Sequence, residues 1–180
     1  LSQLRRHVGM VFQRPNPLPL SIRDNVLFAH RIHRADEKFN KLEEDEIVEN
    51  ALRRVLLWDE VKDRLGREAT GLSLEEQQKL CIARLLPVKP TVILMDEPTS
   101  VLTPQEVADL FVTLKKLAAD GCAILYISHK LEEVREICSE ATILRGGKLV
   151  QSCIPQEHSQ KELAEMMIGK KLTELARANI

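Results

Sequence analysis

The stretch Val92–Ser100 reads VILMDEPTS, four apolar residues that run directly into two carboxylates, a proline and two hydroxyls. A short apolar run bounded by turn residues is typical of a strand that is buried on both faces of a parallel sheet. Ligands of open parallel sheets bind outside the carboxyl ends of the strands. Asp96 and Glu97 are therefore predicted to stand at the sheet edge where a ligand binds.

Two further apolar runs have the same character. Val8–Phe12 (VGMVF) ends at Gln13, and Ala123–Ile127 (AILYI) is followed after one serine by His129. Carboxyl ends of parallel strands meet at one edge, so the four polar side chains at these three strand ends are predicted to gather there. Such a set suits phosphoryl transfer, which needs a carboxylate for Mg²⁺, an acceptor that orients water and a donor near the γ-phosphate. Taken singly, each is equally consistent with a turn or a helix start, so the prediction depends on their order.

Several helices are marked by their start signals. A hydroxyl residue precedes a glutamate by three positions in three places, the capping-box pattern. The pairs are Ser73 and Glu76, Thr103 and Glu106, and Ser159 and Glu162. Pro104 at a first helical position and Gly121 beyond the end predict a helix over about 104–119. Apolar residues at helical spacing predict another helix from Ile47 to Leu56.

These elements together predict an α/β fold with a parallel sheet. The prolines of Arg14–Pro19 exclude helix and central strand and predict an extended loop. A helical segment is then inserted between Pro15 and Leu86, and its stretch Asp36–Glu46 is so charged that we expect a solvated surface. Apolar runs on either side of Arg145–Gly147 predict a hairpin over 141–150.

The composition excludes several classes of function. The 180 residues suit one domain with a sizeable core, and the net charge of -1 does not favour nucleic acid or an anionic membrane surface. No apolar run approaches the roughly 20 residues that cross a bilayer, and the first residues are not of signal-peptide type. The four cysteines are scattered among apolar neighbours, which favours small core residues in a reducing cytoplasm. We therefore expect a soluble chain that associates with a membrane only through a partner.

The motifs resemble those of ATP-binding-cassette (ABC) ATPases. Ile93–Ser100 resembles the Walker B segment of that family, and Val8–Gln13 resembles its Q-loop strand. Ile127–His129 is similar to its H-loop, and Leu72–Arg84 to its signature helix. Together the motifs cover most of the chain from Arg5 to about Gly169, in the family's order. The resemblance implies a P-loop NTPase-like fold.

Roles for the strand-end residues follow from the resemblance. Asp96 and Gln13 are implied to hold Mg²⁺. Glu97 is implied to polarise the attacking water, and His129 to contact the γ-phosphate. The implied catalytic residues are thus Gln13, Glu97 and His129, and the implied cofactors are ATP and Mg²⁺.

The same resemblance implies partners. Ser73 and Gln77 would belong to a half-site that completes ATP binding on a second ATPase subunit in a head-to-tail dimer, and Val101–Thr103 would cross that interface. Transmembrane permease subunits would be the other partners. The implied location is cytoplasmic, peripheral on the inner face of the cell membrane.

The resemblance also implies a division of the chain. Residues 1–15 and 89–150 correspond to segments of a RecA-like core, residues 16–88 to a helical subdomain, and residues 151–180 to a carboxy-terminal extension. No Gly-x-x-x-x-Gly-Lys-Ser/Thr pattern occurs in the sequence, although this Walker A loop supplies the amides and the lysine that cradle phosphate. We therefore expect that an amino-terminal part is missing from this chain and that tight ATP binding fails without it.

The subfamily signals are divided. Val8–Asn25 and Gln77–Leu86 are similar to phosphate-import ATPases. From Thr99 onward the segments resemble sugar or nucleoside importers instead. These segments are 101–107, 127–134 and 163–169. Two such patterns in one chain are consistent with a recombinant, a designed chimera or a divergent relative.

A second departure from the family lies in the signature helix. Its two glycines after Leu-Ser are Leu74 and Glu75 here, followed by Glu76. Glycine lets helix amides approach a phosphate closely, whereas carboxylates in the first turn complement the helix dipole themselves and repel a nucleotide. This favours a well-capped helix over a good ATP half-site.

Three functions remain open at this point. The first is the ATP-hydrolysing subunit of an importer for phosphate or for a sugar or nucleoside. The second is a truncated or chimeric, non-catalytic ABC-derived domain that does not bind ATP alone. The third is a soluble ABC ATPase of DNA repair or translation. The importer-like loop Pro15–Asn25 and the near-neutral charge argue against the third, and no nucleic-acid partner is expected.

Overall fold

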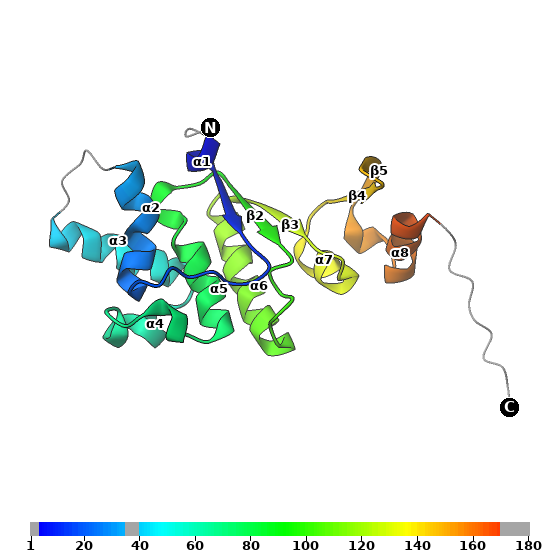
Figure 1. Ribbon diagram of the computed structural model, residues 1–180. Coiled ribbons are helices and arrows are strands. Elements are labelled where there is room, and N and C mark those ends of the chain that lie inside the picture. The colour runs from blue at the N-terminus through cyan, green and yellow to red at the C-terminus, as the bar shows by residue number, and fades with distance from the viewer. Residues whose placement is uncertain (1–3, 35–39, 170–180) are drawn as a thin grey trace, which may run out of the picture. The chain divides into compact units, whose positions relative to one another are not determined.

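The structure, a computed structural model, describes residues 4–34 and 40–169. Figure 1 shows its helices and strands in chain order. They are α1 (Leu4–His7), β1 (Val8–Val11), α2 (Ile22–His33), α3 (Lys41–Arg54), α4 (Trp58–Val61), α5 (Leu74–Ala83), β2 (Val92–Asp96), α6 (Pro104–Ala119), β3 (Ala123–Ile127), α7 (Leu131–Ile137), β4 (Ala141–Arg145), β5 (Lys148–Cys153) and α8 (Gln160–Ile168). They form two compact units, Leu1–Ile127 and Ser128–Ile180, where the length had suggested one domain.

The first unit is built on the predicted parallel sheet. Strand β2 lies in the middle and pairs in parallel with β1 on one side and β3 on the other. Met10, Leu94 and Leu125 stand next to one another in the register. Side chains alternate between the faces of a strand, so each such row of three points to one face of the sheet. The fold class predicted from the apolar runs is confirmed.

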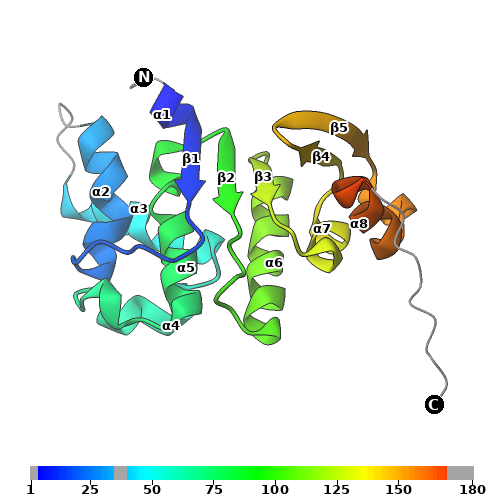
Figure 2. The same cartoon turned by 45° about the vertical axis from the view of Figure 1, so that its right-hand side comes forward.

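One face of this sheet is packed. Figure 2 shows β1, β2 and β3 side by side, with α5 and α6 behind them. The Phe111 ring of α6 meets the Tyr126 ring of β3 edge-on, with 6.2 Å between the centroids. A Cβ on Gly9 would come within 2.7 Å of the Leu85 side chain, so a glycine allows β1 to approach this layer closely. The middle strand contributes Ile93, which is fully buried.

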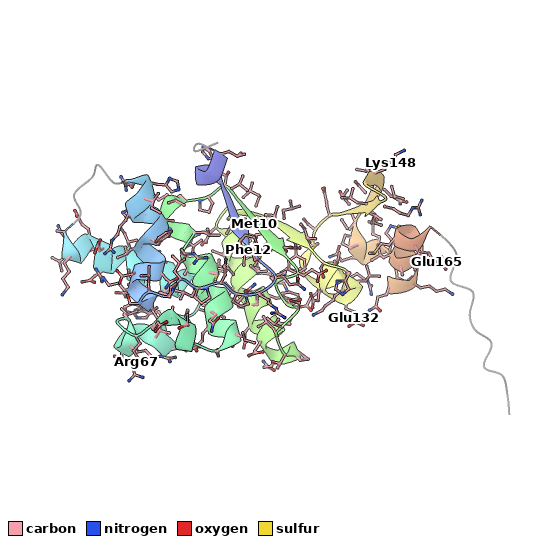
Figure 3. All side chains as sticks on the ribbon, viewed as in Figure 1. Met10, Phe12, Arg67, Glu132, Lys148 and Glu165 are labelled. Atoms are coloured by element: carbon pink, nitrogen blue, oxygen red, sulfur yellow. The ribbon has the colours of Figure 1, made fainter. Side chains whose placement is uncertain are left out.

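The opposite face is exposed, which corrects the prediction that these strands are buried on both sides. Met10 is 44% exposed and Leu125 54% exposed. Phe12, which with Met10 is labelled in Figure 3, lies two residues further along and is exposed as well. The apolar runs were interpreted correctly as strands of a parallel sheet. In the described part of the chain, however, these side chains are not covered.

The inserted segment forms the predicted helical layer, which contains α2 to α5. Helix α3 begins at Lys41, six residues before the predicted start at Ile47. The Asn40 side chain accepts a hydrogen bond from the Glu43 amide, and Glu43 returns one to Asn40, which closes a capping box. The part of the charged stretch that follows Asn40 is therefore helical, while residues 36–39 lie outside the described residues.

The helix starts predicted from sequence are confirmed. All three expected capping boxes are present, at Ser73, Thr103 and Ser159. Helix α6 spans Pro104–Ala119 as predicted, and Gly121 after it takes a φ of 91°, in the left-handed region that favours glycine.

The second unit contains α7, the antiparallel hairpin β4–β5 and α8. Its turn uses Gly146 and Gly147, both with positive φ, as the predicted hairpin requires. Its buried apolar residues, within the described part of the chain, are Ile143 of β4, Pro155 and Leu163 of α8. Across the described residues of both units, no helix is long and apolar enough to span a membrane.

The four cysteines are free thiols. Cys81 and Cys122 are buried, whereas Cys138 and Cys153 are half-buried. Burial raises the pKa of the Cys81 and Cys122 thiols. The burial of this pair agrees with the small core residues that the sequence suggested.

Candidate functional site

The carboxyl edge of β1 and β2 holds the first part of the predicted site. Gln13 follows β1, and its Nε2 donates a hydrogen bond to Oε2 of Glu97, 3.2 Å away. Asp96, the last residue of β2, is half-buried beside it in the chain. Residues 84 positions apart in sequence are thus in direct contact at this edge. The parallel pairing of β1 with β2 brings them together, as the strand-end positions predicted.

The backbone at Glu97 is unusual. Its φ is 42°, in the left-handed region that non-glycine residues seldom adopt. The Glu97 amide donates to the carbonyl of Ile127 at 2.9 Å, and its own carbonyl accepts from the Ser100 amide at 3.1 Å. A residue in this region costs of the order of 1–3 kcal/mol and persists only where its surroundings hold it. The Glu97 carboxylate therefore lies at the carboxyl edge of the sheet, where the backbone leaves the direction of β2.

Ser100 adds a second link between the two loops. Its Oγ donates to the carbonyl of Gln13, 3.4 Å away. The Gln13 side chain contacts Glu97 while its backbone contacts Ser100, so the Q-loop and the turn after β2 are joined twice. No spacing in the sequence singled out Ser100 for this contact.

The start of α5, which carries the predicted half-site residue Ser73, is closed by its own side chains. The Ser73 Oγ accepts from the Glu76 amide at 3.2 Å, and the Ser73 amide donates to Glu76 Oε2 at 2.8 Å. Arg64 donates to the other oxygen of the Glu76 carboxylate. Gln77 donates to the carbonyls of Leu72 and Thr70, at 2.8 and 3.2 Å. Ser73 and Gln77 thus make local contacts within residues 70–77.

A buried ion pair lies one turn into the same helix. Lys79 is only 4% exposed and pairs with Glu75. Burial raises the pKa of the neighbouring Glu60 carboxyl, and the charge of Lys79 works against that shift. Glu75, which stands at one of the family's two glycine positions, and Glu76, which follows it, are therefore each paired with a cation of this chain, Glu75 with Lys79 and Glu76 with Arg64.

His129, the third predicted catalytic residue, belongs to the second unit. It is exposed and lies just before α7 (Leu131–Ile137). In this turn the Lys130 amide donates to the Ser128 Oγ at 3.0 Å. The structure therefore brings Gln13 and Glu97 together in the first unit, whereas His129 belongs to the second unit.

Comparison with known proteins decides the family. Residues 1–100, more than half of the chain, match the ABC transporter family. The chain belongs to the ABC transporter family. The resemblance inferred from the Walker B, Q-loop, H-loop and signature segments is confirmed.

Two similar proteins illustrate the membership. The chain is 44% identical over 151 residues to the phosphate import ATP-binding protein PstB of Oceanobacillus iheyensis, which covers 84% of this chain and 53% of that protein. The structure of this chain matches that of cbiO1 from Clostridium perfringens, which is described as part of the ABC transporter complex cbiONQ. That match has a TM-score of 0.76 and 25% identity, and it covers 93% of this chain and 63% of the other. The chain thus spans roughly half to two thirds of the length of these relatives.

The donor set at the sheet edge fits the magnesium nucleotide that ABC transporter ATPases use. Mg²⁺ takes oxygen ligands, commonly one or two carboxylates together with substrate phosphates. Asp96 and Glu97 are the carboxylates at this edge, and the side-chain oxygen of Gln13 stays available because the nitrogen of that amide faces Glu97. Among the described residues no group of three or more His, Cys, Asp or Glu side chains could hold a metal by itself.

Three further residues of this ABC transporter chain contact the loops of the site, and sequence reasoning gave them no role. Asn16 accepts hydrogen bonds from Arg84 through its backbone and side-chain oxygens, both at 3.2 Å. Gln78 donates to the carbonyl of Pro98 at 3.2 Å. One signal was available in the sequence. Gln78 lies at helical spacing from the apolar residues Cys81 and Ile82, and a polar side chain buried in such a position is expected to make a hydrogen bond.

Proposed function

We propose that this chain is the ATP-hydrolysing part of an ABC importer subunit that takes up phosphate. The observation that carries the proposal is the contact between Gln13 and Glu97 at the carboxyl edge of the sheet. The contact supports the proposal because it joins an amide and a carboxylate that the family resemblance assigns to the γ-phosphate and the attacking water. The half-buried Asp96 stands directly before Glu97. These are the parts that phosphoryl transfer requires from the protein.

Each residue has a distinct task in this proposal. Asp96 and the Gln13 oxygen bind Mg²⁺, and MgATP supplies the phosphoryl group when bound. Glu97 orients the attacking water and accepts its proton, while the Gln13 amide holds the Glu97 carboxylate in place. His129 donates a hydrogen bond to the γ-phosphate. Ser73 and Gln77 face the nucleotide of a second ATPase subunit in a head-to-tail dimer.

Phosphate is favoured over a sugar or nucleoside as the transported solute. The relative that is 44% identical over 151 residues is a phosphate import ATP-binding protein. The resemblance of the segments after Thr99 to sugar or nucleoside importers is the competing signal. Uptake assays with a permease of each class would separate the two solutes.

Permease subunits and the inner face of the membrane complete the proposal. The cbiO1 relative is described as part of an ABC transporter complex, which supports an assembly of this kind. Membrane association of this chain would then depend on the permease. In its described residues the chain has no helix that spans a membrane.

The test of catalysis compares Glu97→Gln with the unaltered protein. ATP binding is proposed to need a phosphate-binding loop, so both versions are prepared with and without a Walker A segment placed before Leu1. With the segment, Glu97→Gln is expected to lower hydrolysis by about 10²–10⁴-fold and to keep MgATP binding in calorimetry. Glu46→Gln, which alters an exposed carboxylate of α3, is the matched control and should hydrolyse normally. A folded protein with the segment that hydrolyses no ATP would contradict the proposal.

A second candidate function is a non-catalytic ABC-derived domain. It is favoured by the closed start of α5, where the Glu76 carboxylate accepts from the Ser73 amide and the Ser73 Oγ accepts from the Glu76 amide. The same calorimetry distinguishes it. Saturable MgATP binding by the 180-residue chain alone excludes this candidate, and no binding by a folded chain with or without the segment supports it.

A further inference from the structure

Gln78 is a fully buried amide at the centre of the first unit. Its side chain is 0% exposed, and its Nε2 donates to the carbonyl of Pro98, 3.2 Å away and 20 residues distant in sequence. Pro98 directly follows Glu97, the residue with the left-handed backbone. Helix α5 is therefore hydrogen-bonded to the turn that carries the proposed catalytic carboxylate.

The other end of the same side chain is unsatisfied. The Gln78 Oε1 is buried and has no hydrogen-bond partner among the described residues. A buried acceptor without a partner costs stability, and an apolar side chain of the same shape would avoid that cost. Gln78 therefore gains nothing for stability from one half of its amide, which points to the other half as the reason for a polar residue here.

The C-terminal end of α5 and its cap residue Arg84 contact the neighbouring loop. The Arg84 guanidinium donates to both oxygens of Asn16, and the Cys81 Sγ contacts the Asn16 Oδ1 at 3.7 Å. Asn16 lies three residues after Gln13 in the Q-loop. One helix is thus bonded to both loops whose side chains meet at the contact between Gln13 and Glu97.

We propose that Gln78 is a positioning residue. Its bond to Pro98 holds the Glu97 turn of the proposed nucleotide site beside the Q-loop. Arg84, at the end of the same helix, holds the Q-loop through Asn16. The proposal rests on the proposed function for its catalytic meaning. Its structural content is that the Gln78 bond offsets the local cost of the left-handed Glu97 backbone. Without that bond, the turn and the Gln13–Glu97 contact loosen while the rest of the unit stays folded.

The test replaces Gln78 with methionine, which has a similar shape and no donor. Amide exchange is followed by NMR without nucleotide at Ser100 and Leu102, whose amides close the turn on Glu97 and Thr99. Gln78→Met is expected to raise the exchange rate of both at least about tenfold and to shift the side-chain amide resonance of Gln13. The urea midpoint of unfolding should stay unchanged, since an unsatisfied oxygen is removed together with the bond.

Thr113→Val is the matched control. Thr113 is also 0% exposed and donates to a loop carbonyl, that of Val55 at 3.3 Å, from the helix α6. Its replacement should leave the Ser100 amide and the Gln13 resonance unchanged. Unaltered Ser100 exchange in Gln78→Met would overturn the proposal. So would an equal rise at Ser100 and at a core amide such as that of Leu114, because it would show a purely structural effect.

A second variant keeps the test decisive if Gln78→Met does not fold. The carboxyl group of Gln78→Glu can donate to Pro98 only when it is protonated. The Ser100 exchange rate of Gln78→Glu is compared with that of Thr113→Val at each pH. The two rates should be similar at low pH, and Gln78→Glu should exchange faster as the pH rises and its carboxyl group loses the proton. Ser100 exchange that ignores this titration would overturn the proposal. No nucleotide is used, so failure of the ATPase proposal would appear separately, in the Glu97→Gln comparison.

Discussion

The two faces of the three-stranded sheet have the same kind of side chain and opposite surroundings. On one face Ile93 is 0% exposed under the layer formed by α5 and α6, whereas on the other Leu125 is 54% exposed. The strands that supply both faces are apolar in almost every position. Sequence pattern alone therefore predicts burial for both faces, and the described elements provide it for one.

This difference teaches where the stability of the first unit comes from. Apolar side chains stabilise a fold by the area removed from water, so an exposed leucine contributes little. Of the two faces, the packed one holds the buried strand residues Val11, Ile93 and Met95, and it is also the side on which α5 contacts β1. A contiguous exposed apolar face is in addition a surface prone to association. The site edge is thus supported from one side only.

The largest expected effect comes from cutting the same residue type on the two faces. Ile93→Ala should lower the free energy of unfolding by about 2–5 kcal/mol, because it leaves a cavity in the packed layer. Ile127 is 45% exposed on the open face, and Ile127→Ala should cost well under half as much. Urea denaturation of both variants measures the two losses. Equal losses would mean that the second face is covered in solution.

A smaller effect is expected from the helix that forms the packed layer. The Thr103 Oγ1 caps α6 by accepting from the Glu106 amide at 3.4 Å. Thr103→Ala should lower the free energy of unfolding by about 1 kcal/mol, because it leaves an amide of the first turn without this partner. Thr103→Ser keeps the hydroxyl and should stay near the unaltered protein in the same denaturation experiment. If serine costs as much as alanine, packing of the threonine methyl group matters more than the cap.

The smallest effect is expected in the helical layer beyond the packed face. Glu44 of α3 accepts from Arg31 at 2.9 Å and from Arg23 at 3.1 Å, and chiefly the Arg31 bond lowers the pKa of its carboxyl. A lowered pKa contributes stability above the ordinary value of 4.5 and loses it as the pH falls through the folded value. The pair is partly exposed, so the contribution should be about 1 kcal/mol or less.

The pH dependence of Glu44 is tested by thermal unfolding between about pH 6 and pH 3. Glu44→Gln should remove part of the stability that the unaltered protein loses over that range. Glu46→Gln, two positions along the same helix and exposed, is the matched control and should keep the full loss. An identical pH profile for Glu44→Gln and the unaltered protein would contradict a stabilising role for the pair.

Local signals predicted most of the individual elements. Helix α6 was predicted with its observed bounds because a threonine cap, a proline and a glycine all mark its ends. The start of α3 was predicted too late, because its cap is an asparagine and its first turn is polar. Of the site, the strand-end positions of Gln13 and Glu97 were predicted to meet, and they do. The tasks of Ser73, Gln77, Asp96 and His129 remain predictions that the nucleotide experiments address.

The sequence by itself determined what short-range chemistry controls: the three strands of a parallel sheet, the capped helices and the family's motifs at the strand ends. Only the tertiary structure decided which face of the sheet is covered, that Glu97 takes a left-handed backbone, and that Gln78 and Arg84 hold the loops around it. The physical reason is the distance along the chain. Caps and strand runs depend on neighbours within a few residues, whereas burial and the bond from Gln78 to Pro98 join segments that only folding brings into contact.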